Sequence, residues 1–222
     1  MELRRVAVLI SGSGTNLQAL IDATKTGRVP VRIVLVLSSR EDAYGLERAR
    51  RAGIPTLVVS PKDHPSRADY DAAIGCALEE AGAEIVCLAG FMRLLGAELV
   101  RAWEGRMLNI HPSLLPAFPG LEVHERVLEA GMPVTGCTVH FVTPEVDAGP
   151  VIVQGVVPVL PGDTPEALRE RVLEVEHRAY PRALDLVVRG RTRIEGERVV
   201  VRDEAPGERL LLHPMLARWI RP

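Results

Sequence analysis

Two polar side chains near the middle of the chain stand two positions apart. Asn109 and His111 lie in the apolar segment MLNIH, and prolines follow at positions 112, 116 and 119. Residues two apart on a strand share a face, so the amide and the imidazole should project together, away from the core. The prolines cannot continue a strand and hold its exit in one geometry. Such a pair suits stabilisation of a developing negative charge and transfer of a proton.

A carboxylate could assist this histidine. A histidine that works near neutral pH benefits from a nearby acid, which favours its protonated form. Asp147 lies in TPEVDAGP, a turn between two extended segments. From spacing alone, an aspartate shortly before a glycine is more typical of an Asx turn than of catalysis. The residues by themselves leave its role open.

A second polar segment follows the first apolar strand. The sequence ISGSGTNLQAL places Gly12 and Gly14 in a turn before a helical pattern, and Ser13, Thr15 and Asn16 add side-chain donors. In a parallel sheet such a turn presents backbone N–H groups and a helix N-terminus, which together favour an anion. A single phosphate is the ligand that fits this turn best.

Two other interpretations of the glycine turn stay open. The dinucleotide motif requires a third glycine where this chain has Leu17, and usually an acid after the second strand. That strand ends instead in SSRE, so a site that binds NADP would have to use Arg40. A plain tight turn without a ligand is the other alternative.

Hydrophobic periodicity alternates over the first half of the chain. Strands are expected at 5–10, 31–39, 56–60, 84–90 and 107–111, and helices at 16–27, 45–53, 66–82 and 97–105. Apolar strands separated by helices predict an α/β fold, a Rossmann-like, mostly parallel sheet with helices on both faces. Ligands of such sheets collect outside the carboxyl ends of the strands. The glycine turn and the Asn/His pair should therefore border one site if the first and fifth strands lie near each other.

The second half of the chain is less regular. Extended segments are expected at 136–143 and 150–160, side by side, and a long helical pattern covers 164–190. Pro181 is expected to interrupt that helix. A single domain is expected over 1–222, with a phosphate-binding half at 1–105, a catalytic half at 106–195, and a C-terminal hairpin and tail at 196–222.

Composition excludes several classes of function. The 222 residues carry a net charge of −2, which argues against broad binding to nucleic acid. No apolar run is long enough to span a membrane, and a cytoplasmic location is expected. Three cysteines at no metal-ligand spacing, each among apolar neighbours, predict buried inert thiols: Cys76, Cys87 and Cys137.

Five separated segments carry a family resemblance. They are ISGSGTNLQALIDA, LAGFMRLL, LNIHPSLLPAFPG, TVHFVTPEVDAGPVI and EHRAYP. In this order they closely resemble glycinamide ribonucleotide formyltransferase of purine biosynthesis, over about residues 5–195. The resemblance implies transfer of the formyl group of 10-formyltetrahydrofolate to the amine of glycinamide ribonucleotide, giving N-formylglycinamide ribonucleotide and tetrahydrofolate. It implies small-molecule substrates, no metal, and a monomer or weak homodimer.

The resemblance also implies that the half at 106–195 binds folate, and it implies roles for individual residues. The implied catalytic residues are Asn109, His111 and Asp147. The implied ribonucleotide site comprises Gly12, Ser13, Gly14, Thr15, Asn16 and Glu176. The implied folate site comprises Arg67, Met92, Arg93, Leu94, Leu95, Asn109, Thr143, Glu145 and Asp147. The Leu115–Pro116 bond is expected to be cis, and Ala148 is a minor departure from the family pattern. His140 is expected either to border the site or to be structural, and the other histidines are expected to be structural or at the surface: His64, His124, His177 and His213.

Competing functions are distinguishable. Methionyl-tRNA formyltransferases and formyltetrahydrofolate hydrolases share HPSLLP and the Asn-x-His pair. The first are expected to add a C-terminal tRNA domain and the second an N-terminal regulatory domain, and a chain of this length is expected to hold neither. In a non-catalytic sensor of nucleotide phosphate, Asn109 and His111 would have only a structural role. An NADP oxidoreductase would require a nicotinamide cofactor.

Overall fold

The computed structural model of the chain describes residues 3–202. The strands of the main sheet are β1 (Arg4–Ile10), β2 (Val31–Ser38), β3 (Thr56–Val58), β4 (Ile85–Leu88), β5 (Met107–His111), β6 (Val134–Phe141) and β7 (Val151–Pro158). The helices are α1 (Thr15–Lys25), α2 (Tyr44–Arg51), α3 (Arg67–Glu80), α4 (Ala97–Ala102), α5 (Val123–Glu129) and α6 (Pro165–Val188). A short 3₁₀ helix (Pro61–Asp63) precedes α3. A separate hairpin consists of β8 (Thr192–Glu195) and β9 (Arg198–Val201).

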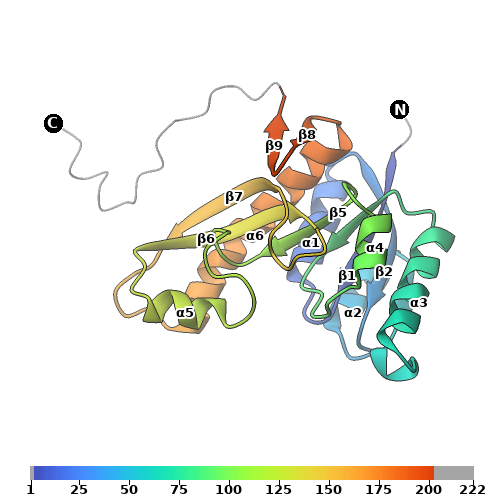
Figure 1. Ribbon diagram of the computed structural model, residues 1–222, viewed down its shortest axis with the longest axis horizontal. Coiled ribbons are helices and arrows are strands. Elements are labelled where there is room, and N and C mark those ends of the chain that lie inside the picture. The colour runs from blue at the N-terminus through green and yellow to red at the C-terminus, as the bar shows by residue number, and fades with distance from the viewer. Residues whose placement is uncertain (1–2, 203–222) are drawn as a thin grey trace.

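The main sheet has seven strands in the order β3-β2-β1-β4-β5-β6-β7 (Figure 1). Strands β1 to β5 are parallel, whereas β6 and β7 are antiparallel to their neighbours. The predicted α/β fold with a mostly parallel sheet is confirmed, and the two extended segments of the second half pair as predicted. One strand, β4, separates β1 from β5. The carboxyl ends of these three strands therefore share one edge of the sheet.

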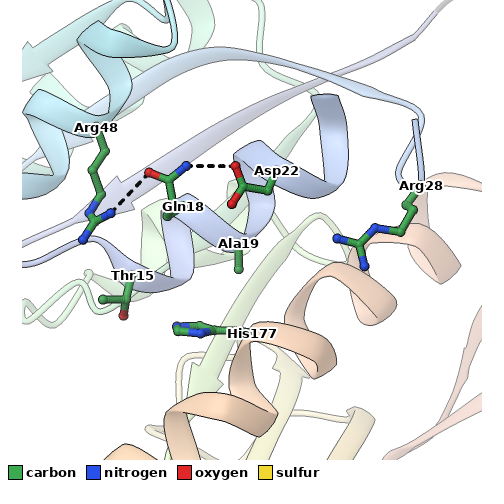
Figure 2. Close-up of a pocket in the computed structure, with 7 residues that line it drawn as sticks. All are labelled: Thr15, Gln18, Ala19, Asp22, Arg28, Arg48 and His177. Atoms are coloured by element: carbon green, nitrogen blue, oxygen red, sulfur yellow. Dashed lines mark hydrogen bonds between the residues drawn. The ribbon is translucent and has the colours of Figure 1, made fainter. Parts of the chain in front are cut away.

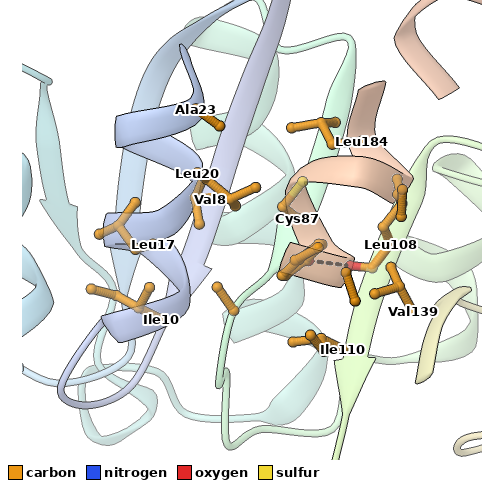
Figure 3. Packing of buried hydrophobic residues seen from close by; sticks show 14 of the residues in the cluster. Val8, Ile10, Leu17, Leu20, Ala23, Cys87, Leu108, Ile110, Val139 and Leu184 are labelled. Atoms are coloured by element: carbon orange, nitrogen blue, oxygen red, sulfur yellow. Dashed lines mark hydrogen bonds between the residues drawn. The ribbon is translucent and has the colours of Figure 1, made fainter. Parts of the chain in front are cut away.

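The sheet separates two apolar clusters. Because successive side chains of a strand point to opposite faces, Val8 and Ile10 pack with Leu17 and Leu20 of α1 on one face (Figure 3). Leu9 packs on the other face, in the cluster that α3 and α4 cover. Helices α5 and α6 share the face of α1. Both faces of the central strands are thus removed from water, as their continuous apolar sequences predict.

Helix α6 runs unbroken from Pro165 to Val188, so the predicted interruption at Pro181 is wrong. Proline removes one backbone hydrogen bond, but Pro181 is buried and its neighbours Tyr180 and Leu184 are almost inaccessible to water. The Tyr180 hydroxyl donates to the carbonyl oxygens of Leu88 and Leu108, at 3.0 and 3.1 Å. Packing and these two bonds hold the helix against β4 and β5 across the proline.

The C-terminal hairpin and the cysteines differ in part from what the sequence predicts. The predicted C-terminal hairpin forms but begins at Thr192, before the expected bound at residue 196, while the tail from residue 203 and His213 lie outside the described residues. Cys87 and Cys137 are buried, and burial raises the pKa of each thiol to about 12. Cys76 is exposed instead, because it lies on the outer face of α3.

The hydroxyl of Tyr180 provides a test of how α6 is held. In Tyr180→Phe the ring is kept and both hydrogen bonds are lost, so we expect the free energy of unfolding to fall by about 1–2 kcal/mol. Urea denaturation followed by circular dichroism measures this change. Tyr44→Phe, at an exposed tyrosine, is the control and should unfold like the parent. Equal midpoints for Tyr180→Phe and the parent would contradict the proposed support.

Candidate active site

His111 ends β5 and is held by two different oxygen atoms. Its Nε2 lies 2.9 Å from the carbonyl oxygen of Phe118, and its Nδ1 lies 3.4 Å from Asp147 Oδ2. A carbonyl oxygen can only accept, so Nε2 carries a proton and donates it to Phe118. The residue is buried, with 7% of its side chain exposed. Nδ1 is therefore the atom that can take up and release a proton, beside a carboxylate.

The proline segment 112–120 brings the Phe118 carbonyl to this ring. The Leu115–Pro116 bond is cis, as the resemblance implies. The Ser113 hydroxyl donates to the carbonyl oxygens of Ala117 and Phe118, at 2.5 and 3.2 Å. Phe118 has a φ of 54°, in the left-handed region that turns the chain sharply. The segment thus fixes the orientation of the imidazole through a backbone group.

Asp147 lies in the turn between β6 and β7, and its carboxylate reaches the proline segment. Oδ2 accepts the backbone N–H of Gly120 at 2.8 Å, and Oδ1 lies 3.9 Å from His140 Nε2. Its own φ is 54°, and its side chain is 10% exposed. The carboxylate therefore bonds outside its own turn, which differs from the Asx turn that the local sequence favours.

Asn109 is oriented by His140, which faces it across the β5–β6 ladder. His140 Nδ1 donates to the carbonyl oxygen of Phe141 at 2.9 Å, which leaves Nε2 to accept from Asn109 Nδ2 at 3.2 Å. Burial lowers the pKa of His140 and keeps the ring neutral, as this arrangement requires. The second N–H of the Asn109 amide is then available to a ligand. His140 borders the site, as expected.

The glycine turn after β1 leaves the start of α1 without a side-chain cap. Gly14, at the N-cap, has a φ of 69°, and a Cβ there would lie 2.6 Å from the Cα of Gly45. Gly45 donates its N–H to the Gly12 carbonyl at 3.0 Å, so α2 holds the turn closely. Arg48 of α2 adds a bond from Nε to the Ser13 carbonyl at 2.9 Å. The turn has the free N–H groups and the nearby positive charge that suit an anion.

Glu176 of α6 meets this turn from a distant part of the chain. Asn16 Nδ2 donates to Glu176 Oε2 at 2.6 Å. Burial, only partly offset by this bond, raises the pKa of Glu176 to about 7. The structure therefore brings together the glycine turn and the glutamate that the resemblance implies for the ribonucleotide.

A pocket of about 400 Å³ lies beside the turn, between α1, α2 and α6 (Figure 2). It is lined by Thr15, Gln18, Ala19, Asp22, Arg28, Arg48 and His177. Arg48 donates to the Gln18 amide oxygen at 3.3 Å, and the Gln18 amide nitrogen donates to Asp22 at 2.9 Å. His177 lies across the pocket from α1, and burial lowers its pKa. Thr15 is the predicted site residue that borders this pocket.

The implied folate residues fall into three groups. Arg67, Arg93 and Leu94 line a second pocket of about 340 Å³, together with Pro61, His64, Pro65, Ser66 and Tyr70. Met92 and Leu95 follow β4 in the same loop, and the Met92 N–H donates to Ser11 Oγ at 2.8 Å. Thr143 and Glu145 lie in the turn of Asp147, where the Thr143 hydroxyl donates to the Glu145 carbonyl at 3.1 Å.

Several backbone and side-chain groups of this site were not predicted from the sequence. The Phe118 carbonyl and the Gly120 amide are backbone groups, which no residue type reveals. Ser11, which bonds to Met92 at the end of β1, lies in the quoted glycine segment but had no role predicted for it, and Arg48 belongs to no motif. Within residues 3–202 there is no cluster of three or more histidine, cysteine or acidic side chains suited to a metal ion. The same range includes no helix that is both long and apolar enough to cross a membrane.

An α/β sheet whose edge presents an amide, an imidazole and a carboxylate can stabilise and protonate the intermediates of acyl transfer. A model of the family described as formyl transferase matches residues 4–184. The chain therefore belongs to the formyl transferase family.

Named relatives are similar over most of the chain. Phosphoribosylglycinamide formyltransferase of Escherichia coli strain K12 is 46% identical over 189 residues, which cover 85% of this chain and 89% of the relative. The trifunctional purine biosynthetic protein adenosine-3 of Gallus gallus is 56% identical over 190 residues. The match covers 86% of this chain, but the chain spans only about a fifth (19%) of that protein.

A solved structure has a similar level of sequence identity to this chain. Glycinamide ribonucleotide transformylase 1 from Symbiobacterium toebii is 56% identical and superposes with a TM-score of 0.88. The match covers 90% of this chain and 94% of that chain. The similarity therefore extends to the arrangement of the elements that carry the site.

The buried carboxyl of Glu176 predicts a pH dependence of stability. Its pKa is about 7 in the folded protein against 4.5 ordinarily, so the folded chain binds this proton more tightly than the unfolded chain. Stability should therefore fall as pH rises from about 4.5 to about 7. Glu176→Gln removes this titration and should gain roughly 3 kcal/mol relative to the parent over that range.

Urea denaturation at several pH values measures this difference. Glu174→Gln, at an exposed glutamate of the same helix, is the control and should follow the parent. A constant difference between Glu176→Gln and the parent at all pH values would disprove the assignment.

Proposed function

We propose that the chain transfers the formyl group of 10-formyltetrahydrofolate to the amine of glycinamide ribonucleotide, a step of purine biosynthesis. The observation that carries this proposal is the His111 ring, with Nε2 bonded to a carbonyl and Nδ1 3.4 Å from Asp147. The high similarity to phosphoribosylglycinamide formyltransferases supports the same assignment.

In the proposed reaction the amine attacks the formyl carbon and a tetrahedral intermediate forms with a negatively charged oxygen. Asn109 donates its second N–H to this oxygen, and protonated His111 donates from Nδ1. Each donor is fixed beforehand, Asn109 by His140 and His111 by Phe118. Donors oriented before reaction are effective, since one of them is worth about 2.7–4 kcal/mol of the barrier.

The intermediate collapses when the bond between the formyl carbon and N10 of the folate breaks. The attacking nitrogen loses one proton, and N10 of tetrahydrofolate gains one. His111 Nδ1 holds the proton to be delivered, and the Asp147 carboxylate stabilises the positive charge of the ring. The transfer runs directly or through a water molecule. No step of this chemistry requires a metal ion.

The ribonucleotide is proposed to bind at the glycine turn. The free N–H groups at the start of α1, in the segment from Gly12 to Asn16, hold the phosphate. Arg48, bonded to the Ser13 carbonyl, brings a positive charge to the same turn. Glu176 accepts from Asn16 and faces the ribonucleotide. On this proposal residues 1–105 supply the phosphate site and part of the folate site, and 106–195 supply the catalytic residues, Glu176 and the rest of the folate site.

The folate is proposed to bind along the loop after β4 and the turn after β6. Arg67 and Arg93 place two guanidinium groups at one pocket, where they suit the carboxylates of the glutamate part of the folate. Met92, Leu94 and Val146 expose apolar side chains that suit its ring system. Thr143 and Glu145 complete the turn that carries Asp147.

An assay with both substrates tests the function. Formyl transfer should require glycinamide ribonucleotide and 10-formyltetrahydrofolate together, with formation of tetrahydrofolate followed by absorbance. Release of free formate without the ribonucleotide would favour a hydrolase, and formylation of charged initiator tRNA would favour a tRNA formyltransferase. A change of absorbance that depends on nicotinamide would favour an oxidoreductase. Monomer or weak homodimer stays a prediction for sedimentation to test.

The role of His111 provides a sharper test. His111→Ala removes both the donor to the oxygen and the proton carrier, so we expect kcat to fall by about 10³-fold. Binding of the ribonucleotide, measured by calorimetry, should stay within a few-fold because the glycine turn is unchanged. Turnover within a few-fold of the parent would instead support a non-catalytic sensor.

A further inference from the structure

A buried carboxylate lies behind the pocket that contains Arg67 and Arg93. Asp71 of α3 is 7% exposed, although a charged carboxylate is rarely removed from water unless it has partners. It is one helical turn after Arg67, and Oδ2 lies 3.8 Å from Arg67 Nε. The chemistry proposed above does not use this carboxylate, so its burial calls for a separate explanation.

The same oxygen also holds the loop after β4. Asp71 Oδ2 accepts the backbone N–H of Gly96 at 2.8 Å. Gly96 is the N-cap of α4 and directly follows the segment 92–95. A Cβ at position 96 would overlap with Asp71 Oδ2, so this close approach requires a glycine. One carboxylate oxygen therefore joins α3 to the loop on which Arg93 and Leu94 stand.

The pocket has a further group that suits an acceptor ligand. Tyr70 lines it and is 4% exposed, and its buried hydroxyl has no hydrogen-bond partner among the described residues. Burial raises the pKa of this hydroxyl to about 12, so it remains a donor. An unpaired buried donor beside two guanidinium groups indicates that an anionic acceptor completes the site.

We propose that Asp71 is a positioning residue for the folate side of the site, an inference that rests on the proposed function. Asp71 Oδ2 lies 3.8 Å from Nε of Arg67, and the terminal Nη groups of Arg67 can then meet a carboxylate of the folate. It fixes the opposite wall of the pocket through Gly96. Arg67 has a half-exposed side chain, and holding it before binding reduces the entropy that binding must overcome.

The test is Asp71→Asn. The amide oxygen can still accept from Gly96, but the negative charge beside Arg67 is lost. We expect KM for 10-formyltetrahydrofolate to rise about tenfold, the effect of losing roughly 1.4 kcal/mol of binding, because the site is no longer preorganised. kcat and KM for the ribonucleotide should stay within about twofold. Glu80→Gln, at an exposed acid at the far end of the same helix, is the control and should leave all three constants unchanged.

Two readouts separate positioning from a general loss of structure. In an Arg67→Gln background, Asp71→Asn should have no further effect on KM, because Arg67 is the group it positions. A folate co-substrate without its glutamate should show the same KM with the parent and with Asp71→Asn. Independent effects of the two substitutions, or an undiminished effect with the truncated folate, would overturn the proposal.

Gly96→Ala is a second variant, to be used if Asp71→Asn does not fold. Its added Cβ displaces the carboxylate, and it should give the same rise in KM for the folate. Failure of the parent to transfer a formyl group would refute the proposed function itself. An active parent whose KM for the folate is unaffected by both variants would refute only the positioning role of Asp71.

Discussion

The proposed catalytic edge depends on one hydrogen bond, from His111 Nε2 to the carbonyl oxygen of Phe118. This bond settles which nitrogen of the ring carries a fixed proton and which one faces Asp147. It exists because the proline segment folds back onto the end of β5 and because Ser113 holds the same turn. A stiff backbone therefore determines the protonation chemistry of a side chain seven residues earlier in the chain.

The two proposed substrate sites are connected by short polar contacts at the ends of β1, β2 and β4. Ser11, at the end of β1, bonds to Ser39 after β2 and accepts from Met92 after β4. Asn16 bonds to Glu176 of α6, so the longest helix also reaches this edge. Apolar strands bury both faces of the sheet, and polar groups gather where the strands end. The fold thus confines its chemistry to a single edge.

Local patterns predicted the fold and part of the site. Continuous apolar strands between helices indicated the parallel sheet, and the two-residue spacing of Asn109 and His111 indicated a shared face. Glu176, in contrast, lies 160 residues from Asn16, and its role followed from the family resemblance alone. The predicted interruption at Pro181 was wrong because the helix propensity of a single residue does not include the packing of α6 on the sheet. The bonds made by Phe118 and Asp71 involve backbone groups and tertiary contacts, which residue types do not encode.

Among the described residues, those other than glycine with a positive φ are Phe118, Glu122 and Asp147, and all three lie in the two loops beside His111. Such a conformation costs a side-chain-bearing residue on the order of 1 kcal/mol. Glycine or asparagine would relieve this strain at position 147 but would remove the carboxylate. Directed evolution that selects for heat resistance alone should therefore favour those residues at position 147, and the proposed activity would be lost with the carboxylate. To raise the thermal stability of this protein without losing activity, a screen must also measure product formation.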